Sequence, residues 1–103
     1  MEGAFLQTLS RTLKEELRFS PTRVESISWE TYPILNATEV PERIDVVFVN
    51  NAPGQAPGAA GEPAVKVVPP SVVNAVFDAT GVRFRQVPLT PARVKAGLRA
   101  AGL

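Results

Sequence analysis

One stretch decides the expected fold class, Ile-Asp-Val-Val-Phe-Val-Asn at residues 44–50. Ile44, Val46 and Phe48 fall on one face of an extended chain, because successive side chains of a β-strand point to opposite faces. The other face starts with Asp45 and continues with two valines, so part of the strand is expected to be buried on both sides. This segment therefore predicts a β-strand and, with it, a sheet.

Weaker patterns around this segment predict the rest of the sheet. Residues 24–29 favour a strand, whereas residues 31–40 are extended but interrupted by Pro33, which indicates an edge or irregular path. Residues 64–68 and 83–89 are two further short strand candidates. These segments alternate with helical patterns but do not repeat a strand–helix–strand unit, so the sheet is expected to be mixed or mostly antiparallel.

Three amphipathic segments predict the helices that would cover the sheet. The first spans residues 3–17 and carries an apolar stripe at helical spacing. The stripe consists of Phe5, Leu9 and Leu13. Pro-Pro-Ser at 69–71 opens the second helix, which closes at Gly81, and the third helix starts from Thr90 as its N-cap. The predicted fold is thus a single α+β domain over residues 1–103, with three helices packed on a small sheet.

The composition excludes several kinds of site. The 103 residues contain neither Cys nor His, which rules out thiolate metal sites, iron–sulfur clusters on this chain and histidine-based triads. No metal-ligating residues are therefore predicted. A formal net charge of +1 argues against nucleic acid or a membrane as the partner. The polar residues 1–17 match neither a signal peptide nor a transit peptide, so a cytoplasmic location is favoured and a periplasmic one stays open.

Residues 50–63 are expected to form a flexible loop, because they combine Pro and Gly with other small residues. Glu62 lies near the end of this loop and is the only acidic residue between Asp45 and Asp78. A lone carboxylate in apolar surroundings can have a raised pKa and act as a general base. The alternative interpretation is a solvated glutamate in a flexible loop, and residue spacing alone favours that alternative.

A series of short motifs runs through the whole chain. In order, they are Glu2-Gly3-Ala4-Phe5-Leu6-Gln7, Glu15-Glu16-Leu17 with Phe19-Ser20-Pro21, Thr31-Tyr32-Pro33-Ile34, Glu39-Val40-Pro41, Gly58-Ala59-Ala60-Gly61-Glu62-Pro63, Val68-Pro69-Pro70 with Asn74-Ala75-Val76-Phe77-Asp78-Ala79-Thr80-Gly81, and Val87-Pro88-Leu89-Thr90-Pro91-Ala92-Arg93. Together they resemble the C-terminal segment of the molybdopterin-binding large subunit in the xanthine dehydrogenase and aldehyde oxidase family, which includes isoquinoline and aldehyde oxidoreductases. Thr8 and Gly58 depart from the glycine and the lysine that are common in that family.

The resemblance implies roles for individual residues. Glu62 would be the catalytic base of a hydroxylation that uses oxygen from water, because the glutamate of the family's Gly-Glu-Pro motif has that role. Ala59, Ala60 and Gly61 would lie against the molybdenum cofactor, in its molybdopterin or its cytosine dinucleotide form. Gln7 would belong to the same cofactor-binding site.

The resemblance also implies partners. The chain would be the C-terminal part of a molybdenum-cofactor-binding domain. It would work with the upstream remainder of the large subunit and with an iron–sulfur subunit or domain, on small aldehydes or N-heterocycles. The isolated chain is expected to bind no cofactor and to be inactive, because most cofactor contacts of the family lie upstream. The alternative function is a self-standing, non-catalytic α+β interaction module that kept the fold and lost the activity.

Overall fold

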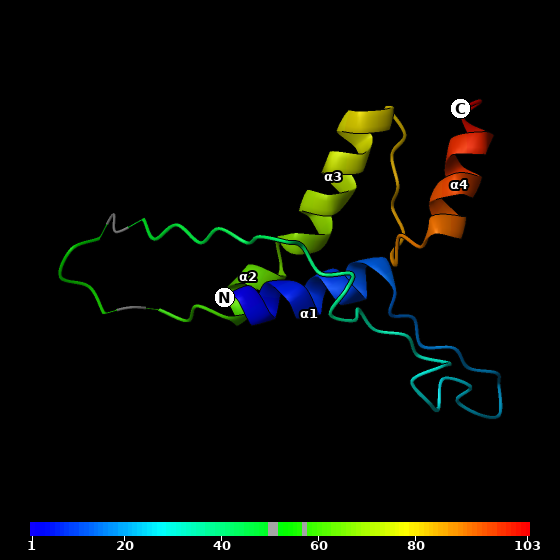
Figure 1. The fold of residues 1–103 in the computed structure, drawn as a ribbon, viewed down its shortest axis with the longest axis horizontal. Coiled ribbons are helices and arrows are strands. Elements are labelled where there is room, and N and C mark those ends of the chain that lie inside the picture. The colour runs from blue at the N-terminus through cyan, green and yellow to red at the C-terminus, as the bar shows by residue number, and fades with distance from the viewer. Residues whose placement is uncertain (50–51, 57) are drawn as a thin grey trace.

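The computed structural model of the chain describes residues 1–49, 52–56 and 58–103. The elements of these residues are helices, shown in chain order in Figure 1. They are α1 (Glu2–Leu13), α2 (Glu62–Val65), α3 (Val68–Thr80) and α4 (Pro91–Ala100). The described residues form no strand, and their only β pairing is an isolated antiparallel bridge between Phe19 and Val24. The predicted α+β class with a mixed or antiparallel sheet is therefore wrong for this structure.

The segment that most strongly predicted a strand, residues 44–49, has no neighbouring strand to pair with among the described residues. Residues 44–49 have no regular secondary structure, and position 50 lies outside the described residues. No main-chain N–H or C=O group of residues 41–49 makes a hydrogen bond within the described parts of the chain. A sheet exists only where neighbouring strands exchange such bonds, so an alternating pattern without a neighbour leaves a single extended segment.

Three other segments predicted as strands have different structures. Residues 24–29 lead into a turn in which Tyr32 N donates to Ser28 O at 2.8 Å. Residues 64–68 comprise the end of α2, a turn at 66–67 and the first residue of α3. A proline in the first turn of each helix supports helix initiation. Residues 83–89 form an irregular connection from α3 to α4.

The loop predicted at residues 50–63 falls partly outside the described residues, at positions 50, 51 and 57. Its described part has no helix until Glu62, where α2 begins. The last two residues of the predicted loop therefore belong to a helix.

Local helix signals are confirmed at two positions. Gly81 closes α3 with a φ of 70°, a left-handed conformation that side chains other than glycine rarely adopt. Thr90 caps α4, where its hydroxyl oxygen accepts a hydrogen bond from Arg93 N at 3.3 Å. The first helix is shorter than predicted, because α1 ends at Leu13 and not at position 17.

The buried face of α1 also differs from the predicted apolar stripe. Leu9 is buried, but Phe5 and Leu13 are only half-buried, and Thr8, Ser10 and Thr12 are buried instead. The two threonine hydroxyls donate to main-chain carbonyls one turn earlier, at 2.8 Å and 2.7 Å. These bonds satisfy the polar groups inside the helix, so the threonines can face neighbouring segments without a desolvation penalty.

Helix α1 is the element around which the other segments gather. It packs against both α2 and α3. Leu89 N donates to Thr12 O at 2.7 Å, which joins the C-terminal end of α1 to the segment before α4. The Arg93 guanidinium and the Glu16 carboxylate form an ion pair at 3.0 Å across the same junction.

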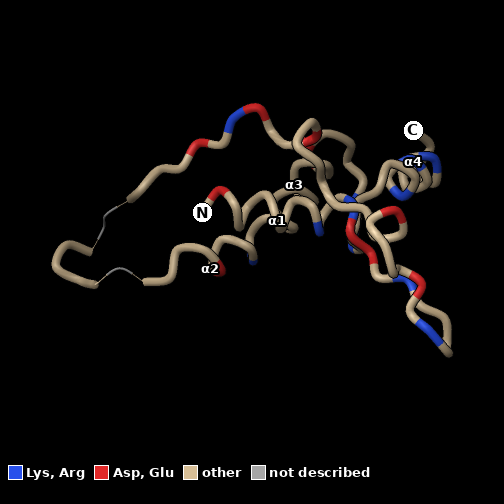
Figure 2. Tube along the Cα trace, turned by 60° about the horizontal axis from the view of Figure 1, so that its bottom comes forward, with Lys and Arg blue, Asp and Glu red and all other residues tan. Residues whose placement is uncertain are grey.

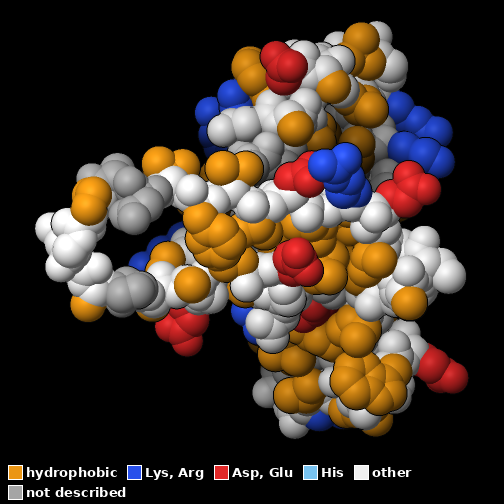
Figure 3. All heavy atoms as spheres, turned by 60° about the vertical axis from the view of Figure 1, so that its left-hand side comes forward, with side chains coloured by type: hydrophobic (Ala, Val, Ile, Leu, Met, Phe, Trp, Pro, Cys, Tyr) orange, Lys and Arg blue, Asp and Glu red, His pale blue; other side chains and the backbone are white. Residues whose placement is uncertain are grey.

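The buried apolar core is small for a chain of this length. Among the described residues it consists of Leu9, Val68, Phe84 and Leu89. The chain exposes 8060 Å², whereas a compact monomer of its mass exposes about 5600 Å². Its radius of gyration is 16.9 Å, against about 13 Å for a compact chain of this length. Figure 3 shows hydrophobic side chains gathered over one exposed face of the molecule.

Candidate functional site

Glu62 is the first residue of α2, directly after the N-cap residue Gly61. Its side chain is exposed. The helix that carries it packs against α1 and α3, so the backbone of Glu62 is anchored while the carboxylate stays free to face another surface. In Figure 1, α2 lies beside the N-terminal end of α1. The apolar surroundings expected for Glu62 are therefore not supplied by the described residues.

The small residues before Glu62 leave open space beside the backbone. Ala59 and Ala60 are exposed. A Cβ atom built on Gly58 or Gly61 would meet no atom within 4 Å, and neither glycine has a positive φ. Neither internal packing nor backbone conformation therefore requires a glycine at these two positions. Within the described residues, no main-chain N–H of 58–61 donates a hydrogen bond, so these groups are available to an external acceptor.

Gln7 lines a cleft to which Glu62 does not contribute. It is exposed on α1, which forms this cleft with residues 29–40. The structure brings α1 and α2 into contact. Four of the predicted site residues are consecutive in the chain: Ala59, Ala60, Gly61 and Glu62. The side of α1 that carries Gln7 instead forms part of the cleft.

The cleft has a volume of about 480 Å³, and we call it the α1 cleft. Its lining residues are Leu6, Gln7, Ser10, Glu15, Trp29, Tyr32, Ile34, Leu35, Asn36, Ala37 and Val40. Tyr32 donates its hydroxyl hydrogen to Glu15 Oε2 at 3.0 Å, and this bond is the main cause of the raised pKa of the Tyr32 phenol. Trp29 is 77% exposed, so its side chain is not part of the buried core.

Sequence reasoning did not single out the α1 cleft as a site. The available signal was the pair of aromatic residues three positions apart, Trp29 and Tyr32, directly before Pro33. The cleft depends on pairing between distant segments. For example, Leu35 N donates to the hydroxyl oxygen of the buried Ser10 at 3.0 Å. Such a contact over a long sequence separation cannot be read from local patterns.

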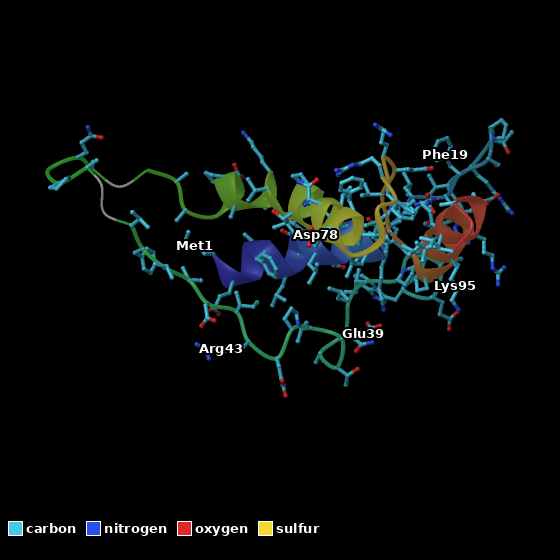
Figure 4. All side chains as sticks on the ribbon, turned by 90° about the horizontal axis from the view of Figure 1, so that it is seen from above. Met1, Phe19, Glu39, Arg43, Asp78 and Lys95 are labelled. Carbon is cyan, nitrogen blue, oxygen red and sulfur yellow. The ribbon has the colours of Figure 1, made fainter. Side chains whose placement is uncertain are left out.

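An ion pair borders the α1 cleft. Lys14 is paired with Glu39, which also accepts a hydrogen bond from Asn36 N at 3.1 Å. The hydrogen bond from Lys14, and then that from the Asn36 amide, lowers the pKa of the Glu39 carboxyl. Figure 4 labels Glu39 on the segment that runs alongside α1. The pair fixes the 36–39 turn against the C-terminal end of α1.

The described residues fit an anionic cofactor better than a bare metal ion. In the parts of the chain that the structure describes, no three Asp or Glu side chains come together as a metal site. Unpaired main-chain N–H groups and small side chains at Ala59 and Ala60 are the features that an anionic group needs for close approach.

Among the described helices, none is long and apolar enough to cross a membrane.

Charge is unevenly distributed around this region. The sequence from Val46 to Gly61 holds no charged residue, and its described part is drawn as an uncharged arm in Figure 2. Helix α4 carries Arg93, Lys95 and Arg99, and the same view marks basic positions along its trace. Of these, Arg93 is paired with Glu16 and so is not a freely solvated group. The arm that leads to Glu62 is therefore suited to contact with neutral or apolar surfaces.

Comparison with known proteins relates the chain to oxidoreductases. No protein-family model matches it. It is 40% identical over 102 residues to one of the subunits of nicotinate dehydrogenase from Pseudomonas putida, covering 99% of this chain and 8% of that protein. It is 37% identical over 98 residues to a membrane-bound aldehyde dehydrogenase (pyrroloquinoline-quinone) of Gluconacetobacter polyoxogenes, covering 95% of this chain and 12% of that protein.

A third relative is the beta subunit of isoquinoline 1-oxidoreductase from Brevundimonas diminuta, 30% identical over 92 residues, which are 89% of this chain and 11% of that protein. The chain thus spans roughly a tenth of the length of these relatives. None of the three names mentions molybdenum, and one names a different cofactor. The resemblance drawn from the motifs is confirmed at the coarser level: nearly the whole chain is similar to a short segment of enzymes that are named dehydrogenases or oxidoreductases.

Proposed function

We propose that this chain is a portion of a molybdenum hydroxylase that oxidises aldehydes or N-heterocycles, and that it acts only when assembled with the remainder of the large subunit. The observation that carries the proposal is the match of 99% of the chain to 8% of the nicotinate dehydrogenase subunit. The open surface of the structure supports it, because a chain that exposes so much apolar area is stabilised by burying that area against other segments.

Glu62 is the proposed general base. Its carboxylate oxygen would accept a proton from the attacking water-derived group, while α2, packed on α1 and α3, holds its backbone in place. The exposed position of Glu62 fits this role in an assembly, since the substrate side of the site would come from the other part of the subunit. The remainder of the subunit would exclude water from the Glu62 carboxylate. Removal from water raises the pKa of a carboxyl group, which makes its carboxylate a stronger base.

Ala59 and Ala60 are the proposed contacts to the cofactor. Their main-chain N–H groups would donate hydrogen bonds to its anionic groups, and their small side chains would permit close approach. A bound molybdenum cofactor would supply the two-electron redox chemistry that side chains of this composition do not provide. Gln7 is a weaker cofactor candidate, because it lines the α1 cleft.

A chimeric protein tests this proposal. The matching segment of the nicotinate dehydrogenase subunit would be replaced with this chain, and oxidation of nicotinate would be measured. We expect activity in the chimera and a fall in kcat of about 10²–10⁴-fold for Glu62→Gln, because that is the usual contribution of a general base.

The matched control is Glu30→Gln, which changes another exposed glutamate in the same way and is expected to leave kcat unchanged. Full turnover by the Glu62→Gln chimera would exclude the role as base. A folded chimera without nicotinate oxidation would contradict the proposed function as a whole.

A further inference from the structure

The segment of residues 43–49 is extended and lacks main-chain partners within the described parts of the chain (Figure 1). Within the described residues, none of its N–H or C=O groups takes part in a hydrogen bond. Val47, Phe48 and Val49 are 80%, 81% and 77% exposed. An extended row of unsatisfied N–H and C=O groups flanked by apolar side chains is the surface on which another strand pairs.

One side-chain contact at the start of this segment agrees with the period of a β-strand. Arg43 Nε donates to Asp45 Oδ1 at 2.8 Å, so side chains two positions apart lie on the same face. Figure 4 shows the labelled Arg43 side chain directed away from α1. The sequence between Ile44 and Val49 is rich in β-branched residues, which favour an extended backbone. The residue types of this segment therefore favour the conformation that strand pairing requires.

On one face of this segment Ile44 and Val46 are half-buried, whereas Phe48 is 81% exposed. Val46 and Phe48 border a hollow of about 380 Å³ next to Met1 and Gly3 at the start of α1. The opposite face, with Val47 and Val49, is open to solvent. A strand with apolar residues on both faces is typical of a sheet that is covered on both sides.

We infer that residues 43–49 add as a β-strand to the edge of a sheet in the upstream remainder of the large subunit. The inference rests on the proposed function and names the surface through which this chain would assemble. Strand addition satisfies the main-chain groups, while side-chain contacts on the two faces set the register.

A second copy of this chain is a poorer occupant than the upstream part. Two copies would form only a two-stranded ribbon, which is marginally stable alone, and the described residues hold no sheet to cover the open face of Val47 and Val49. In the relatives, in contrast, about nine tenths of the length lies outside the matched segment. That remainder is long enough to hold both a sheet edge and a covering layer.

Amide hydrogen exchange tests the inference on the chimera described above and on the isolated chain. In a strand that pairs along one edge, alternate N–H groups point to the partner, so we expect at least about tenfold slower exchange at every second amide of residues 43–49 in the chimera. A folded chimera in which these amides exchange as fast as in the isolated chain would overturn the inference. Protection in the isolated chain that rises with its concentration would also overturn it, because a second copy would then be the occupant.

Two proline variants give a second readout. Val46→Pro and Val47→Pro remove N–H groups that point to opposite edges, whereas Val46→Ala and Val47→Ala keep them. We expect one proline variant to lower the melting temperature of the chimera more than its alanine control, and equal effects of proline and alanine at both positions would contradict strand pairing. A chimera with alternating protection but no nicotinate oxidation would leave the strand in place and refute only the proposed catalytic function.

Discussion

The ring of Phe84 occupies the space that a side chain at Gly97 would need. A Cβ atom built on Gly97 would lie 2.4 Å from Phe84 Cε1 and 2.7 Å from Cζ, closer than real side-chain contacts allow. Phe84 is one of the few buried apolar residues, so its ring cannot move into solvent without loss of core contacts. Through this close approach, α4 packs against the segment that connects it to α3.

Gly97→Ala is therefore expected to destabilise the chain. Alanine gains roughly 1 kcal/mol in helix propensity, but the overlap with Phe84 costs about 1–3 kcal/mol, so we expect a small net loss in the free energy of unfolding. Urea unfolding followed by circular dichroism would measure it. The control is Gly3→Ala on α1, where a Cβ meets nothing within 4 Å and the same substitution should stabilise. A gain for both variants would contradict the packing described.

Thr90→Ala should weaken α4. The substitution removes the hydroxyl that accepts from Arg93 N, and loss of such a cap costs about 1 kcal/mol. Thr90→Ser keeps the cap and should retain most of the stability. Thermal unfolding of the two variants in parallel gives the comparison, and equal melting temperatures would exclude a capping role.

Glu39 should titrate below its unfolded-state value. The hydrogen bond from Lys14 lowers its pKa in the folded chain, so its contribution to stability is present above the ordinary value of 4.5 and is lost as the pH falls through the lower folded-state pKa. Lys14→Met should bring the pKa of Glu39 back up, whereas Lys14→Arg should keep it low. NMR titration of the side-chain carboxyl provides the measurement, and an unchanged pKa in Lys14→Met would contradict the pairing.

Tyr32 should lose its proton only above the ordinary pKa of 10.0. The hydrogen bond that it donates to Glu15 stabilises the protonated phenol, so its contribution to stability is fully present below pH 10.0 and is lost as the pH rises through the higher folded-state pKa. Tyr32 is the only tyrosine, so the absorbance of tyrosinate reports on it alone. Glu15→Gln should lower this pKa toward 10.0, and no change would argue against the Tyr32–Glu15 bond.

Gly58→Ala and Gly61→Ala should separate folding from cofactor contact. A Cβ at either position meets no atom of this chain within 4 Å, so the free energy of unfolding of the isolated chain should change by less than about 0.5 kcal/mol. In the chimera we expect lower cofactor content and lower kcat for Gly61→Ala, because the added methyl group would enter the space proposed for the cofactor. Gly58→Ala is the matched control and should leave both unchanged, since the resemblance places a lysine side chain at that position in many relatives. Full molybdenum content and turnover in Gly61→Ala would show that the backbone at this position does not approach the cofactor closely.

The C-terminal end of α3 and the start of α4 were the parts of the fold that local patterns predicted best. Gly81 and Thr90 act through groups within a few residues of themselves, so their effect is visible in the sequence. Strands could not be predicted in the same way. The pattern at 44–49 is that of a strand, but whether it pairs depends on a partner far away in the sequence or in another part of the assembly.

The candidate site was predictable only in part. Glu62 was singled out from its motif and from its isolation among uncharged residues, and its role stays a prediction. Its exposure, the open space beside Gly58 and Gly61, and the position of Gln7 at the α1 cleft came from the structure. The cleft itself arises from contacts such as that of Ser10 with Leu35, which no local pattern encodes.

The sequence alone determined the absence of Cys and His, the helix caps, the uncharged arm and the place of a single glutamate at its end, because each of these depends only on residue type and local order. Only the tertiary structure decided that Thr8 and Thr12 face inward on α1, that Phe84 rests on Gly97, and that the strand-like segment at 44–49 stays unpaired within the described residues. The physical reason is that burial and main-chain pairing are properties of contacts between distant segments, and their free energy depends on which surfaces are present to be covered.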